Sequence, residues 1–142
     1  MNRKRVIVMV TIVLAVIAMY VYREYNRMNL PMIQLKSAYN LNASEFLLEY
    51  EKDISGANKK YLGKVITVTG PIKDVEKEDY VIVIGDTNSL SSIRCSLDSM
   101  IRSQTLNLLR GSIVQIKGNC TGYNKDEMLG SDVILNRSVI IH

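Results

Sequence analysis

The feature that most constrains this chain is an uncharged run near its N-terminus. Residues 6–22 read VIVMVTIVLAVIAMYVY, and the basic segment 1–5 before them contains Arg3, Lys4 and Arg5. At ~1.5 Å of rise per residue, a helix over this run is roughly 25 Å long, a little short of the ~30 Å hydrocarbon core of a bilayer. We therefore predict a basic N-terminal segment followed by one transmembrane anchor.

A cleaved signal peptide and a buried soluble helix are the alternatives to a retained anchor. A secretory signal begins in the same way, so the residues near the end of the run are informative. Ala15 and Ala18 are three positions apart rather than two, and the bulky Met19 and Tyr20 follow them. This pattern gives no convincing cleavage site, and it favours an uncleaved, single-pass anchor.

The basic residues that flank the run predict its orientation in the cell membrane. Three of them precede it, whereas Arg23 and Arg27 follow it together with the acidic Glu24. Loops rich in lysine and arginine remain in the cytoplasm. We expect a cytoplasmic N-terminus and an extracytoplasmic, periplasmic C-terminal domain.

The net charge of +4 belongs to the membrane flank rather than to the rest of the chain. Residues 1–37 hold six of the eighteen basic side chains and a single acidic one, and residues 38–142 hold twelve basic and thirteen acidic ones. Nucleic-acid binding depends on basic groups that displace phosphate counterions. The near-neutral C-terminal part therefore disfavours nucleic acid as a partner.

Residues 23–41 show no sustained hydrophobic period, and we expect them to form a tether. A helix should follow, because Asn42 can cap it and Glu45 can reach back in a capping box. Its apolar residues recur at helical spacing until Gly63. This helix is expected to pack against the core of the domain at 42–142.

The remaining sequence alternates between strand patterns and turns. We expect strands at 65–72, 80–84, 92–97, 112–120 and 133–141, a helix at 98–109 and a polar loop at 121–132. Five strands with a helix between the third and the fourth follow the order of an OB fold, a Greek-key barrel. Gly70 and Gly118 would allow its strands to curve. The predicted class is mainly β (α+β), with an N-terminal amphipathic helix and the transmembrane helix.

Four segments resemble one bacterial family: ANKKYLGK at 57–64, VITVTG at 65–70, RCSL at 94–97 and LRGSIVQIKGNCTG at 109–122. They are similar to the tRNA-anticodon-binding-like OB-fold domains, many of which are small membrane-anchored or lipid-anchored envelope proteins. The resemblance implies an OB fold and an envelope location. In that family the last strand often carries a further cysteine, and Asn136 stands at the corresponding position here.

OB folds bind ligands on their second and third strands and on the adjacent loops. Asp74, Glu76, Glu78 and Asp79 lie near the basic residues of this surface and would repel phosphates. We therefore expect a membrane-anchored binding module of the bacterial envelope whose ligand is a protein, a peptide or an oligosaccharide. Single-stranded nucleic acid is the alternative ligand. The candidate ligand-binding residues are Lys73, Lys77, Tyr80, Arg94, Lys117 and Tyr123.

This sequence lacks the side-chain motifs that usually carry out enzymatic chemistry. The single histidine is His142, and no serine or cysteine belongs to a recognisable nucleophile motif. Cys95 and Cys120 are not in a CxxC motif, so we expect no metal site and no cofactor. Two interpretations of this pair stay open: a disulfide, if the domain is extracytoplasmic, or two small buried residues in strands.

Overall fold

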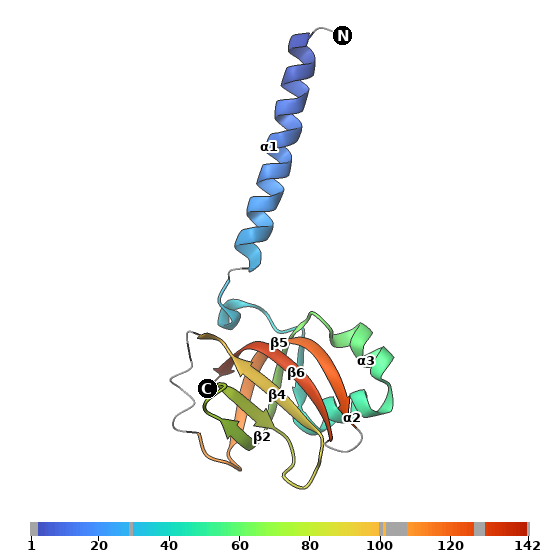
Figure 1. Cartoon of the computed structure of the whole chain (residues 1–142), viewed down its shortest axis with the longest axis vertical. Coiled ribbons are helices and arrows are strands. Elements are labelled where there is room, and N and C mark those ends of the chain that lie inside the picture. The colour runs from blue at the N-terminus through green and yellow to red at the C-terminus, as the bar shows by residue number, and fades with distance from the viewer. Residues whose placement is uncertain (1–2, 29, 100, 102–107, 127–129, 142) are drawn as a thin grey trace. The chain divides into compact units, whose positions relative to one another are not determined.

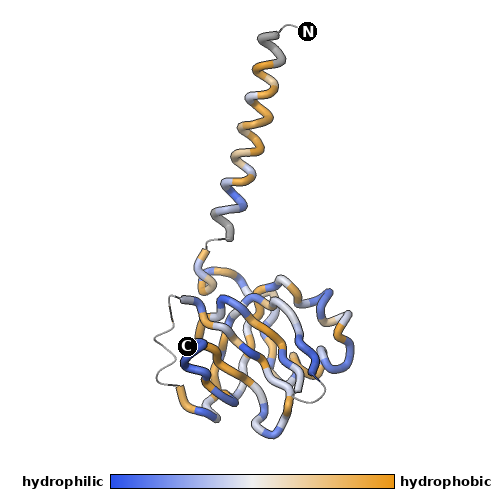
Figure 2. The backbone as a smooth tube through the Cα atoms, viewed as in Figure 1, coloured by the Kyte–Doolittle hydropathy of each residue, from blue (hydrophilic) through white to orange (hydrophobic). Residues whose placement is uncertain are grey.

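The computed structural model describes residues 3–28, 30–99, 101, 108–126 and 130–141. The chain forms two compact units, Met1–Pro31 and Met32–His142. The first unit contains α1 (Arg3–Met28), which is apolar along most of its length (Figure 2). Its segment Ile7–Tyr25 has a mean hydropathy of 1.9, and it is long and apolar enough to cross a membrane. The side chains of this segment are not buried within its own unit.

The second unit is built mainly from strands (Figure 1). Its elements are η1 (Met32–Gln34), β1 (Tyr39–Asn42), α2 (Ala43–Lys52), α3 (Ile54–Tyr61), β2 (Val65–Glu76), β3 (Val81–Ile84), β4 (Ser92–Leu97), β5 (Ile113–Asp126) and β6 (Gly130–Ile141).

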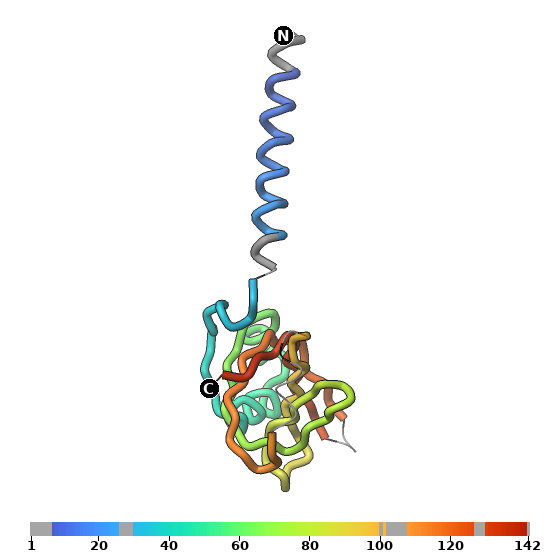
Figure 3. The backbone as a smooth tube through the Cα atoms, turned by 90° about the vertical axis from the view of Figure 1, so that its left-hand side faces the viewer, coloured from blue at the N-terminus to red at the C-terminus, as the bar shows by residue number. Residues whose placement is uncertain are grey.

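Five of these strands close into a barrel. The order β2-β3-β4-β6-β5 returns to β2, because β5 pairs with β2 along Val65–Pro71. The β4 and β6 strands are parallel, and the other neighbouring pairs of the barrel are antiparallel. This is the strand order of an OB fold, and it confirms the fold class predicted from the sequence. Figure 3 shows the strands curving around a shared interior.

The long strand β2 changes partner along its length. Its first half pairs with β5 and, in parallel, with β1, whereas its second half pairs with β3. Gly70 lies near the change of partner, where a Cβ atom would be 2.6 Å from Ala43 Cβ and 2.8 Å from Ile84 Cγ2. The missing side chain therefore lets the start of α2 approach the barrel wall.

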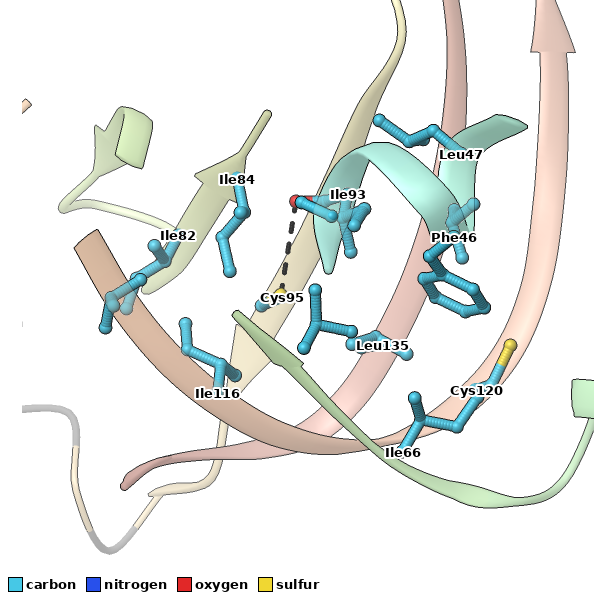
Figure 4. Packing of buried hydrophobic residues seen from close by; sticks show 14 of the residues in the cluster. Phe46, Leu47, Ile66, Ile82, Ile84, Ile93, Cys95, Ile116, Cys120 and Leu135 are labelled. Carbon is cyan, nitrogen blue, oxygen red and sulfur yellow. Dashed lines mark hydrogen bonds between the residues drawn. The ribbon is translucent and has the colours of Figure 1, made fainter. Parts of the chain in front are cut away.

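The core fills the barrel and extends under α2 and α3. Figure 4 shows Phe46 and Leu47 of α2 among strand residues such as Ile66, Ile93 and Ile116. Among the labelled side chains, all except Leu47 are fully buried. Burial of each large apolar side chain contributes about 1.5–3 kcal/mol before entropic costs.

The predicted single helix from Asn42 to Gly63 is wrong, because the structure has two helices. They meet at Asp53, whose own backbone is extended, with φ −153°. Its Oδ1 accepts a hydrogen bond from the Gly56 N–H group at 3.0 Å, so Asp53 caps α3. Asn42 precedes α2 but makes no side-chain cap bond, so the expected capping box does not form.

The segment 23–41, expected to be a tether, is largely structured. Helix α1 continues to Met28, and Met32 in η1 is buried. Strand β1 pairs in register with β2 from Tyr39↔Ile66 to Asn42↔Thr69. A four-residue strand is too short to give a period of its own, and its structure depends on the edge that β2 provides.

The polar loop expected at 121–132 is instead a continuation of the β5–β6 hairpin. Its strands remain paired as far as Asp126↔Gly130. The pairing holds these mostly polar residues in strand conformation. The helix expected at 98–109 lies mostly outside the described residues.

The two cysteines do not form a disulfide. Both are free and buried, so the second interpretation, two small buried residues in strands, is the correct one. Cys95 on β4 and Cys120 on β5 each pair with Leu135 of β6, which lies between them. Two strand spacings of ~4.8 Å separate their Cα atoms by roughly 10 Å, beyond the ~7 Å limit for a disulfide.

Candidate ligand-binding groove

A polar groove of about 460 Å³ crosses β2, β3 and β4 on the outside of the barrel. It occupies the surface that OB folds commonly use for ligands. Six charged side chains line it, three basic and three acidic: Lys73, Asp74, Glu76, Arg94, Arg110 and Asp132.

Strand register explains why these charges share one surface. Val83 of β3 pairs with Asp74 of β2 on one side and with Arg94 of β4 on the other. The neighbouring row Ile72, Ile84 and Ile93 is fully buried in the core. Side chains alternate between the two faces of β3 and β4, and the register shift between Ile72 and Asp74 adds one residue to β2. The row that contains Asp74 and Arg94 therefore faces outward.

Arg94 and Glu76 form an ion pair across the groove. Their Nη2 and Oε2 atoms are 2.6 Å apart, and the two side chains are 37% and 31% exposed. The hydrogen bond with Glu76 raises the pKa of Arg94 further above its usual value. Arg94 is therefore charged at every physiological pH.

A second ion pair joins Arg110 to Asp74. The Arg110 Nε atom donates to Asp74 Oδ1 at 3.0 Å, and the Val75 N–H group donates to the same oxygen at 2.7 Å. The hydrogen bond from Arg110 is the main cause that lowers the pKa of Asp74. The groove thus holds two ion pairs, and the acidic partner of each lies on β2.

The remaining charges of the groove bind groups on its border. The Lys73 ammonium donates to the Ser89 carbonyl, and the Ser92 hydroxyl donates to the Asp132 carboxylate. The loop between β3 and β4 closes this end by packing on Gly130, where a Cβ atom would collide with the Leu90 carbonyl. Gly130 also has φ +96°, so glycine meets both requirements of this position.

The structure brings two of the six candidate residues together in this groove, Lys73 and Arg94. Lys77 lies on the exposed turn after β2, outside the groove lining. Tyr80 has φ +55° and packs against the core.

The other two candidates lie elsewhere on the barrel. The Lys117 ammonium donates to the carbonyls of Ile33 and Leu35 at 3.2 and 3.1 Å, and so holds the segment around η1 against β5. The Tyr123 ring stacks on Tyr50, with their centroids 4.9 Å apart. Both contacts support packing rather than the groove.

Sequence reasoning missed several residues of the groove lining, among them the polar residues Ser92, Arg110 and Asp132. The strand alternation around Arg94 could have found Ser92, which lies two positions earlier on the same face. Arg110 and Asp132 gave no such signal, because one ends a connection and the other lay in an expected loop.

The closed barrel and its outer groove define an OB-fold protein, and comparison with known proteins agrees. The chain belongs to the tRNA_anti-like family, whose model matches residues 1–135. This confirms the resemblance seen in the sequence.

Seven chains of solved structures match this chain. One of them is the crystal structure of a Klebsiella pneumoniae protein described as a "putative nucleic acid-binding lipoprotein", with 18% sequence identity and a TM-score of 0.55. The similarity covers 72% of this chain and 91% of that chain. No curated protein matches the sequence.

Proposed function

We propose that this chain is a non-catalytic binding module anchored in the bacterial cell membrane, and that the groove across β2, β3 and β4 receives its ligand. One observation carries the proposal: the OB ligand surface is a groove whose charges balance, with three basic and three acidic side chains. Its position on the surface that OB folds commonly use for ligands supports this assignment.

The balanced charges favour a protein, a peptide or an oligosaccharide as the ligand. A nucleic-acid groove needs basic groups that are available to phosphates and aromatic rings on which bases stack. Here Arg94 and Arg110 are each paired with a carboxylate, and no aromatic residue of the described chain lines the groove. A polyanion would have to displace Glu76 and Asp74.

The buried thiols support a role without catalysis. Cys95 and Cys120 lie in the core, and burial raises the pKa of both thiols. A thiol that stays protonated is a poor nucleophile. In the described part of the chain, no cluster of three histidine, cysteine or acidic residues could hold a metal ion.

The apolar segment Ile7–Tyr25 supports membrane attachment. The basic residues before it favour a cytoplasmic N-terminus, which would place the barrel in the periplasm. A C-terminal alkaline phosphatase fusion should then be active, and a C-terminal green fluorescent protein fusion should be dark. The opposite pair of results would reverse the orientation.

Single-stranded nucleic acid is the second candidate ligand. The name of the family and the description of the Klebsiella pneumoniae protein favour it. It predicts tight binding of a labelled oligonucleotide, with an affinity that falls steeply as salt is added.

The experiment that tests the proposal measures binding by the full chain in lipid nanodiscs. A peptide array, a glycan array and fluorescent single-stranded DNA and RNA would be compared for the wild type and for Arg94→Gln. The proposal expects peptide or glycan binding that Arg94→Gln weakens. Binding that is equal in both proteins would contradict a role for the groove, and oligonucleotide binding that Arg94→Gln weakens would establish the second candidate.

A further inference from the structure

Contacts within the chain occupy only some of the hydrogen-bonding atoms of the charged side chains in the groove. Among the described residues, the hydrogen bonds of Glu76 involve only Oε2, those of Asp74 only Oδ1 and those of Asp132 only Oδ1. Each carboxylate therefore retains a second oxygen that can accept a hydrogen bond from a ligand.

The two guanidinium groups also retain donors. Arg94 donates through Nη2 alone, and Arg110 donates through Nε and Nη2. A guanidinium group carries five N–H donors, so both side chains can bind a further carboxylate. The groove thus places positively charged donors beside negatively charged acceptors, and both can bind a ligand.

Exposure lets a ligand compete for these charges. The side chains of the Arg110–Asp74 pair are 71% and 43% exposed, and those of the Arg94–Glu76 pair are about one-third exposed. Exposed ion pairs contribute little to stability, so opening one is inexpensive. A ligand that enters between the partners removes water from both charges, and it must then satisfy both at once, because a charge that is buried without a partner is costly.

These observations assign the groove to one class of ligand, and the assignment rests on the proposed function. We infer that the groove binds a short peptide segment that carries both ammonium and carboxylate groups. Its carboxylates would face Arg94 and Arg110, and its ammonium groups would face Asp74, Glu76 and Asp132.

Other ligand classes match the groove less well. A polyanion or a polycation would place like charges against half of the lining, which opposes binding. A neutral oligosaccharide would supply no charge to replace a broken ion pair. Sugars and bases also gain from stacking on aromatic rings, which the described lining lacks.

The test uses the full chain in lipid nanodiscs and an array of hexapeptides in which every position is lysine, glutamate or glycine. We expect the strongest binders to carry both charges with a net charge near zero. Their affinity should fall about tenfold in Arg94→Gln, the size of effect that an interface charge commonly has. Added salt should weaken the binding of these peptides.

Two further variants separate specific recognition from general charge effects. The double variant Arg94→Glu with Glu76→Arg keeps the ion pair and the net charge but reverses its direction, and it should also weaken the best binders. Lys60→Gln is the matched control. Lys60 on α3 forms an ion pair with Glu49 on α2, their side chains are 43% and 41% exposed, and neither lines the groove. It should leave the affinity unchanged.

Three results would overturn the inference. Strongest binders of a single charge sign would exclude a mixed-charge ligand. Binding of a glycan or an oligonucleotide alone, weakened by Arg94→Gln, would refute the inference and leave the groove as the binding site. Peptide binding that neither groove variant changes would contradict both the inference and the proposed function.

Discussion

The hydroxyl group of Tyr50 on α2 lies 3.4 Å from the Sγ atom of Cys120 on β5, inside the core. Tyr50 is fully buried, and it lies between the stacked ring of Tyr123 and the edge-on ring of Phe46. Burial is the main cause that raises the pKa of both groups, so each keeps its proton at neutral pH. This contact connects α2 to the barrel.

The thiols should be present as free but protected groups. In the full chain without reductant, a thiol reagent should modify Cys95 and Cys120 slowly under native conditions, because both side chains are fully buried. In denaturant both should react at once. A requirement for reductant before the denatured chain reacts would show a disulfide and contradict the structure.

Alkaline pH should destabilise the fold through Cys95. Burial raises the pKa of this thiol in the native state, whereas the unfolded chain loses the proton near pH 8.5. The unfolded state then binds fewer protons, so the free energy of unfolding should fall by up to about 1.4 kcal/mol per pH unit above pH ~8.5. Urea unfolding between pH 7 and pH 10 measures it, and Cys95→Ala should show a smaller slope than the wild type. Equal slopes would refute this origin.

Gly118→Ala should destabilise the barrel. A Cβ atom at this position would be 2.5 Å from Ser138 Oγ and 3.1 Å from Leu135 Cβ, at a register shift between β5 and β6. Such overpacking costs about 1–3 kcal/mol. Gly122→Ala on the same strand is the control, since nothing lies within 4 Å of its Cβ position. Unfolding midpoints that fall equally in both variants would contradict the packing argument.

The folded unit should need the residues of β1. A chain of residues 32–142 keeps the pairing of β1 with β2 and the contact of Tyr39 with Tyr61, whose ring centroids are 5.0 Å apart. A chain of residues 43–142 loses both, and at about 1 kcal/mol for each hydrogen bond it should be several kcal/mol less stable. It should also aggregate through the open edge of β2. Size-exclusion chromatography and urea unfolding measure both effects, and equal behaviour would restore residues 23–41 as a simple tether.

The parts of the fold that were predictable are those with a local cause. Strand β4 has the predicted bounds Ser92–Leu97, and the order of the five barrel strands was correct. Each of these strands carries its own alternation or continuous run of apolar residues, which requires no knowledge of a partner. Gly70 and Gly118 were predicted to let their strands curve, and the structure in addition places neighbouring atoms within 3 Å of both Cβ positions.

The parts that were missed depend on partners distant in sequence. Strand β1 exists because β2 offers it an edge, and the β5–β6 hairpin extends through residues that look like a loop. The sequence around Asp53 is compatible with two local structures, one long helix or two capped helices, and the structure has the second. The helical spacing of the apolar residues is compatible with both.

The candidate site divides in the same way. Its place on β3 and β4, with Arg94, and beside the end of the first predicted strand, with Lys73, followed from the strand order, because the order assigns the outer surface. The pairing of Arg94 with Glu76, the positions of Lys117 and Tyr123, and the separation of Cys95 from Cys120 depended on register across neighbouring strands. Local periodicity is a property of consecutive residues, so the sequence alone reveals it. Register arises only when segments that are distant in sequence pack together.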